Sequence, residues 1–180
     1  MFSGCTSLIT TPGLPATTLA DYCYDGMFNG TNILPDCSNI DFANEAVVAS
    51  GGLKGLFSGT KVTDADLERI LPKNSEGNYY LPITILADEC YMKMFYKCTE
   101  LTTAPKLPAT TLADYCYKYM FWECTGLISA PELPATTLAY YCYYNMFSGC
   151  TGLISAPELP ATTLADYCYD GMFSECTGLI

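Results

Sequence analysis

The apolar residues near the end of the chain follow a spacing typical of an amphipathic α-helix. They fall at i, i+1, i+4, i+5, i+8, i+9 and i+12, at Leu164, Ala165, Cys168, Tyr169, Met172, Phe173 and Cys176. Such a stripe predicts one buried helical face, with Thr162 or Thr163 as the N-cap. Segment 150–160 precedes it and contains Pro157 and Pro160. Because proline cannot donate to a strand ladder, we expect only about three residues of parallel strand, around 153–156.

The same pattern recurs along the chain. Variants of the phrase Met-Phe-Ser-Gly-Cys begin near residues 1, 27, 56, 94, 120, 146 and 172, so most units are 26 residues long. Stacked units bury a continuous core that no single unit could bury, and this period lies in the leucine-rich-repeat range. The sequence therefore predicts an α/β fold: a right-handed, leucine-rich-repeat-like solenoid with short parallel strands on one face and short helices on the other.

We expect residues 1–180 to form a single repeat array with irregular units over 27–93. The unit that begins at residue 56 is 38 residues long instead of 26. Within it, 63–71 predicts a short helix capped by Thr63 or Asp64, and 73–78 predicts a surface loop. The chain begins and ends at the same phase of the repeat, so we expect it to be a piece of a longer array.

The phrase LADYCYKYMFWECTGLISAPELP, residues 112–134, resembles the repeats of the BspA-like leucine-rich-repeat surface proteins. In the last unit the matching positions are Leu164-Ala165, Met172-Phe173, Cys176, Thr177 and Leu179. The resemblance covers units 1–26 and 81–180. It implies a non-enzymatic protein-binding or adhesion module on a bacterial cell surface, or secreted, with a protein or glycan ligand on a host or neighbouring cell. We expect the export signal to lie upstream of this chain.

Composition limits the chemistry. The chain has no histidine, which removes the commonest general base and the Ser-His and Cys-His nucleophile pairs. Its 8 basic and 19 acidic residues give a net charge of −11, which argues against nucleic acid as a partner. No stretch approaches the roughly 18 apolar residues that cross a bilayer. We therefore expect no enzyme activity, no catalytic residues, no cofactor, no metal site and no transmembrane segment in this chain.

Repeated carboxylates occupy two columns, a column being the set of equivalent positions in successive units. Asp21, Asp114 and Asp166 share one column, and Glu132 and Glu158 share another. Paired carboxylates can bind calcium or act as acid and base. A repeated surface position also makes a repeated solvated charge, and this is the interpretation that we expect to hold.

Ten of the 11 cysteines occupy two further columns. The first holds Cys23, Cys90, Cys116, Cys142 and Cys168, and the second holds Cys5, Cys98, Cys124, Cys150 and Cys176. Eight residues of helix separate the columns by about 12 Å, beyond disulfide reach. We expect thiols that are buried as small apolar groups. A ladder of disulfides between neighbouring units, or metal binding, is the alternative.

The central units differ from the outer ones at positions expected to face solvent. There, the central units carry tyrosine, lysine and the only tryptophan, where outer units have small or acidic pairs such as Asp25-Gly26. Tyrosine and tryptophan are enriched in interface cores. The candidate binding residues are Lys93, Tyr96, Lys97, Lys118, Tyr119, Trp122, Glu123, Tyr140 and Tyr144.

Two other interpretations stay open for these observations. The differences between units are also expected from repeat drift on a tolerant surface, and a competing surface is the row of Thr103, Ser129 and Ser155 on the expected sheet. The alternative function is a structural spacer, or a self-assembling rod in which stacked copies associate end to end.

Overall fold

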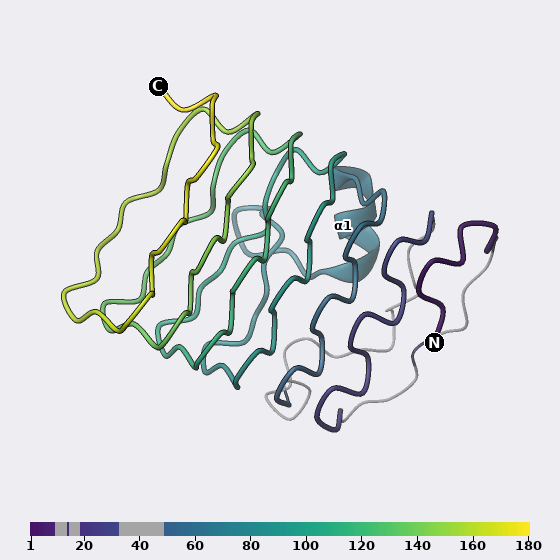
Figure 1. The fold of residues 1–180 in the computed structure, drawn as a ribbon, viewed down its shortest axis with the longest axis horizontal. Helices are drawn as coiled ribbons and strands as arrows, with labels where there is room; N and C mark the ends of the chain where they lie inside the picture. The colour runs from purple at the N-terminus through teal and green to yellow at the C-terminus, as the bar shows by residue number, and fades with distance from the viewer. Residues whose placement is uncertain (10–13, 15–18, 33–48) are drawn as a thin grey trace.

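The structure is a computed structural model, and it describes residues 1–9, 14, 19–32 and 49–180. Successive units form coils that stack side by side along the long axis of the molecule (Figure 1). In the described residues the single helix is α1 (Asp64–Ile70), and strand pairing consists of isolated bridges. The expected α/β, leucine-rich-repeat-like solenoid is therefore wrong, because the coils contain neither the helices nor the sheet.

One side of each coil, which we call the turn side, is a staircase of tight turns where helices were expected. It comprises 88–98, 114–124, 140–150 and 166–176 in the regular coils. Every fourth residue has a positive φ, as at Glu89 (55°), Lys93 (58°) and Lys97 (58°). A left-handed residue ends each turn, so an α-helix cannot propagate through the segment. The same four-residue period buries Cys116-Tyr117 and Met120-Phe121 and leaves the intervening pairs at the surface.

This period explains why the sequence pattern suggested a helix. Residues that recur at a strict spacing of four drift by about 40° per step around a helix of 3.6 residues per turn. Over three such steps, the last residue lies about 120° from the first, well off a single face. The spacing from Leu164 to Cys176 follows this strict four-residue rule, which matches the turns better than a helix.

Backbone hydrogen bonds between coils replace those of a helix or sheet. On the turn side, alternate N–H groups donate within the coil to residue i−3, as Met92 does to Glu89 O at 3.0 Å. The remaining N–H groups donate to the next coil: residues 115, 117, 119, 121 and 123 bind the carbonyl oxygens of 140, 142, 144, 146 and 148 at 2.8–3.0 Å. Buried backbone groups are therefore satisfied without regular secondary structure.

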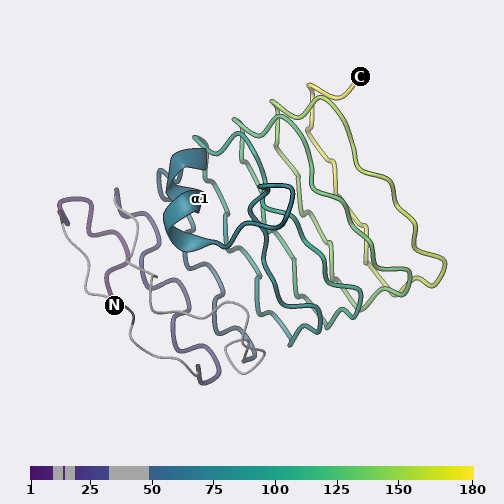
Figure 2. The same cartoon turned by 180° about the vertical axis from the view of Figure 1, so that it is seen from behind.

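The opposite side of each coil, which we call the bridge side, comprises 101–113, 127–139 and 153–165 and is extended (Figure 2). The three-residue strands expected there shrink to single parallel bridges, such as Thr103↔Ser129 and Ser129↔Ser155. Prolines at 157, 160 and their equivalents interrupt any longer ladder, since they cannot donate. The row of Thr103, Ser129 and Ser155 is present and exposed, but on isolated bridges instead of a sheet.

Ladders of identical side chains fill the core between the two sides. Phe121 stacks on Phe95 and on Phe147 with ring centroids 5.5 Å apart in both pairs. Tyr117 stacks in the same way between Tyr91 and Tyr143, at 5.9 and 5.8 Å. All six rings are buried. Each coil thus covers the aromatic faces of its neighbours, which is why a single unit could not fold alone.

The cysteines are free thiols throughout the described residues, so the disulfide ladder is wrong for these. The eight cysteines of units 81–180 are buried as expected, whereas Cys5 and Cys23 are exposed. Cys37 lies outside the described residues. In the second column the thiols also donate to the preceding coil, as Cys124 Sγ does to Phe95 O at 3.0 Å. These thiols are therefore weak donors as well as apolar fillers.

The helix and loop predicted in the irregular unit are confirmed. Helix α1 begins after the N-cap Thr63, whose N–H and hydroxyl both donate to the Asp66 carboxylate, at 3.0 and 2.7 Å. The following loop is exposed and closes through Asn74, whose side-chain oxygen accepts from the N–H groups of Glu76 and Asn78. Figure 2 shows α1 and this loop together in front of the bridge side. In the part of the chain that is described, no helix is long and apolar enough to cross a membrane.

Candidate binding surface

Tyrosines and lysines of four successive coils meet on the turn side. We call this set the tyrosine–lysine surface. It comprises Lys93, Tyr96, Lys97, Tyr115, Lys118, Tyr119, Trp122, Glu123, Tyr140, Tyr141, Tyr144 and Tyr167. Its members occupy the outward pairs of the four-residue period, so the staircase of turns brings them together while their neighbours fill the core.

Lys118 lies at the centre of the surface in a cage of tyrosine rings. Its Nζ is 5.0 Å from the ring centroid of Tyr115, 5.5 Å from Tyr119, 4.5 Å from Tyr141 and 4.8 Å from Tyr144. Each ring lies within the distance at which the face of an aromatic ring attracts a cation. The lysine is thereby held in place by residues from two coils.

A second lysine shares this environment. Lys93 Nζ is 5.5 Å from the ring of Tyr119, the same ring that Lys118 contacts. Partial burial lowers the pKa of Lys118, and the like charge of Lys93 lowers it further. Among the described residues neither ammonium has an ion pair, whereas Lys54 binds Glu89 at 2.8 Å. The surface thus carries two positive charges without an ion pair on a chain of net charge −11, although the charge of Glu89 opposes the lowering of the pKa of Lys118.

An aromatic pair borders the two lysines. Tyr96 stacks on Trp122 with ring centroids 4.7 Å apart and an interplanar angle of 12°. Lys97 Nζ lies over both rings, at 5.7 and 4.9 Å, and forms an ion pair with Glu123 at 3.3 Å. This lysine is therefore neutralised, unlike Lys93 and Lys118.

All nine residues singled out by the comparison of units lie in this one surface. Contacts link them: Lys93 joins Tyr96 to Tyr119, and Tyr119 meets Tyr144 edge to face at 5.5 Å. Sequence reasoning missed Tyr115, Tyr141 and Tyr167, which stack at 5.4 and 4.7 Å. A helix would not have placed these three tyrosines beside the other candidate residues. A tyrosine directly precedes Cys116, Cys142 and Cys168, and this recurrence was the signal that could have found them.

Several of these residues occupy backbone positions with a positive φ, which glycine adopts more easily. Lys93 and Tyr119 have φ of 58° and 57°, in a column that carries glycine as Gly26, Gly55 and Gly171 in other coils, at 55–64°. A left-handed conformation costs a residue with a Cβ roughly 1–2 kcal/mol.

Tyr140 likewise occupies a column in which other coils carry an aspartate that accepts a hydrogen bond from the next coil. In the preceding coils Asp88 Oδ1 accepts from the Asp114 N–H at 3.1 Å, and Asp114 Oδ1 accepts from the Tyr140 N–H at 3.0 Å. The aspartate column is therefore exposed but also links coils, which a purely solvated charge would not. Tyr140 has no carboxylate to continue the series.

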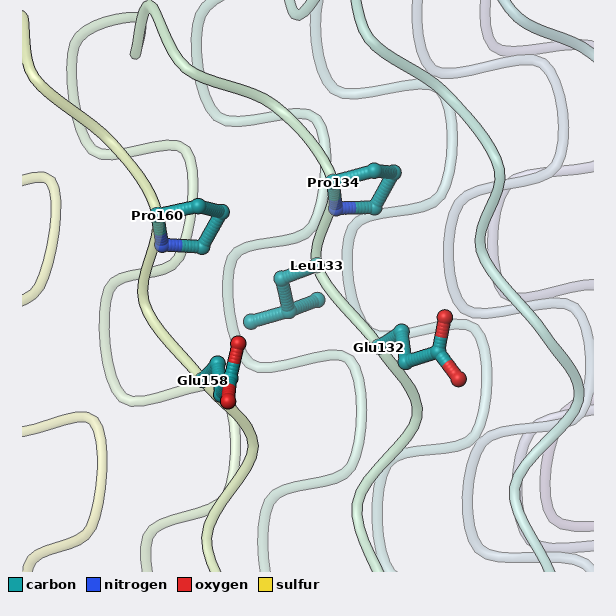
Figure 3. A pocket seen from close by; sticks show the side chains of 5 residues that line it. All are labelled: Glu132, Leu133, Pro134, Glu158 and Pro160. Carbon is teal, nitrogen blue, oxygen red and sulfur yellow. The ribbon is translucent and has the colours of Figure 1, made fainter.

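Cavities on the bridge side are further candidates. One cavity of about 380 Å³ is lined by Glu132, Leu133, Pro134, Glu158 and Pro160 (Figure 3). In this view the Leu133 side chain lies between the two carboxylates, which do not converge. Glu132 is 85% exposed and pairs with Lys106 at 3.0 Å, in line with the expected solvated charge. Within the described residues no cluster of carboxylates and thiols could hold a metal ion.

The second cavity, of about 350 Å³, lies between α1, the loop and the row of Thr103 and Ser129. Its one carboxylate, from Asp64, accepts bonds from the Thr102 N–H, the Thr102 hydroxyl and the Thr103 N–H, at 2.6–3.1 Å. Burial raises the pKa of Asp64, but these bonds outweigh it and lower the pKa. The group therefore serves to attach α1 to the coil.

Comparison of the chain with protein-family models, curated proteins and solved structures gives no match. The resemblance to BspA-like repeats accordingly stays an expectation from the sequence.

Proposed function

We propose that this chain is a non-enzymatic binding module whose ligand contacts the tyrosine–lysine surface. The observation that carries the proposal is the placement of Lys93, Tyr119 and Tyr140 at positions where glycine or aspartate suits the fold better. Tyrosine and tryptophan provide large contact areas at low entropic cost, which suits them to the centre of an interface.

The proposed setting is a cell surface or the extracellular medium, and the proposed ligand is a protein or glycan of a host or neighbouring cell. Nucleic acid is disfavoured by the net charge of −11. The buried free thiols are compatible with this setting because burial raises the pKa of Cys98 and Cys150 to about 12, so little reactive thiolate forms there.

A binding experiment with matched variants tests the proposal. The labelled chain is applied to a printed array of neutral and acidic oligosaccharides and to purified cell-surface glycoproteins. We expect the double variant Trp122→Ser/Tyr144→Ser to lose at least about tenfold of the binding. The control Ile128→Ser/Ile154→Ser, which removes exposed apolar groups from the bridge side, should bind as the parent does. Undiminished binding by the first variant would refute the proposal.

Light scattering at increasing concentration distinguishes the alternative of a self-assembling rod. A scattering mass that grows with concentration supports stacked copies and a structural role. A constant mass together with ligand binding supports the module. Because Trp122→Ser/Tyr144→Ser changes only the turn side, it should leave any end-to-end growth unchanged.

A further inference from the structure

We propose that Lys93 and Lys118 bind the carboxylate of an acidic sugar, on the surface whose binding role was proposed above. Both ammonium groups lie 5.5 Å from the ring centroid of Tyr119, so one tyrosine ring contacts two like charges. Each ammonium has three N–H donors, and in the described residues its contacts at the site are with ring faces alone. An anion placed between the lysines supplies the missing acceptor and offsets their repulsion.

The walls of the site suit a saccharide. A sugar ring has apolar C–H faces and a rim of hydroxyl groups. Tyrosine rings offer the matching combination, an apolar body that ends in a hydroxyl. Tyr96, Tyr119 and Tyr144 contact the two lysines with such groups, and all three are half-buried and therefore partly accessible.

The backbone of the turn side argues against an extended peptide. Peptides that bind by strand addition need unpaired N–H and C=O groups. Here the N–H groups of residues 115, 117, 119, 121 and 123 are bonded to the next coil, and those of the even-numbered residues 116–124 are bonded within their own coil. The ligand must therefore be recognised by side chains, which favours a sugar ring over an extended peptide that binds through its main chain.

The charge of the whole chain limits how acidic the ligand can be. Beyond a Debye length of about 10 Å, a polyanion meets the repulsion of an acidic protein. Asp88, Asp114 and Asp166 lie in a column that borders the surface. Two lysines can hold one carboxylate at short range, but a sulfated polymer would place further anions against these aspartates. The site therefore fits a neutral oligosaccharide that ends in one carboxylate-bearing sugar.

The probe for the test is lactose that carries a single terminal N-acetylneuraminic acid, compared with lactose itself. Calorimetric titration is run at about 20 mM and about 300 mM salt. We expect the acidic sugar to bind at least about tenfold more tightly than lactose at low salt, and this preference to shrink at high salt. Lys118→Met removes the charge but keeps an apolar chain among the rings, and it should abolish the preference.

The control Lys61→Met removes an exposed lysine that does not belong to the tyrosine–lysine surface, and it should leave the preference for the acidic sugar unchanged. Equal affinity of the parent for both sugars, or an unchanged preference in Lys93→Met/Lys118→Met, overturns the carboxylate site. If Trp122→Ser/Tyr144→Ser still removes the binding in that case, the binding function stands without it. Failure of the acidic sugar to bind at about 10 mM also overturns the inference. A glutamate-rich peptide that binds more tightly than the acidic sugar would identify a peptide ligand instead.

Discussion

Replacing Tyr119 by glycine and by alanine tests the claim that the binding surface is built on strained backbone. Both variants lose the same ring contacts, with Tyr144 at 5.5 Å and with the two lysines at 5.5 Å each. Their stabilities therefore differ only through the backbone. Alanine keeps a Cβ at a φ of 57°, and glycine does not.

The expected difference follows from two opposing quantities. A left-handed residue with a Cβ costs roughly 1–2 kcal/mol, which glycine avoids. Glycine loses more conformational entropy on folding, which costs it about 0.5–1 kcal/mol relative to alanine. We therefore expect Tyr119→Gly to exceed Tyr119→Ala in free energy of unfolding by about 0.5–1 kcal/mol.

Urea unfolding, followed by the fluorescence of the single tryptophan, measures this difference. Thr110 provides the matched control, because it is exposed on the bridge side and its φ is not positive. There the order should reverse, with the glycine variant less stable by about 0.5–1 kcal/mol. A Tyr119→Gly variant that is less stable than Tyr119→Ala would refute the strain, and with it the main support for the binding surface.

Four further outcomes follow from the packing. Gly152→Ala should cost about 1–3 kcal/mol in urea unfolding, because its Cβ would lie 2.5 Å from a carbonyl oxygen of the preceding coil. Phe121→Ala should cost about 3–5 kcal/mol, since it empties the centre of the phenylalanine ladder. Tyr140→Asp should gain about 1 kcal/mol through a bond to the next coil, yet weaken ligand binding. Burial raises the pKa of Cys90 and Cys98 to about 12 from 9.0, so stability should be full below pH 9 and fall as pH rises toward 12. A stability that stays constant up to pH 11 would contradict the buried thiols.

The sequence predicted several features because they depend on local chemistry or on repetition. The helix that begins after Thr63 is specified by its own cap and its acidic first turn. The grouping of Lys93, Tyr119 and Trp122 depends only on equivalent positions lying side by side in a stack. The grouping is the same whether each unit is a helix or a series of turns, as long as these positions face solvent in both.

The helices could not be rejected from the pattern alone, because apolar pairs spaced by four residues approximate a helical stripe over two turns. Tyr115 and Tyr141 were missed for the same reason. The four-residue period places them beside the other surface tyrosines, whereas a helical period would place them on a different face of the helix. The strict spacing was visible in the sequence, but its meaning depends on whether a neighbouring coil is present to accept hydrogen bonds.

The sequence by itself determined the repeat, the columns of identical residues, the buried thiols of the regular units and the helix that begins after Thr63. Only the tertiary structure decided between helix and turn. An isolated segment satisfies its backbone best as a helix, whereas a segment stacked between copies can donate every second N–H group to its neighbour. In that arrangement every fourth residue of the turn side takes a left-handed conformation, and Lys93 and Tyr119 lie at two of these positions.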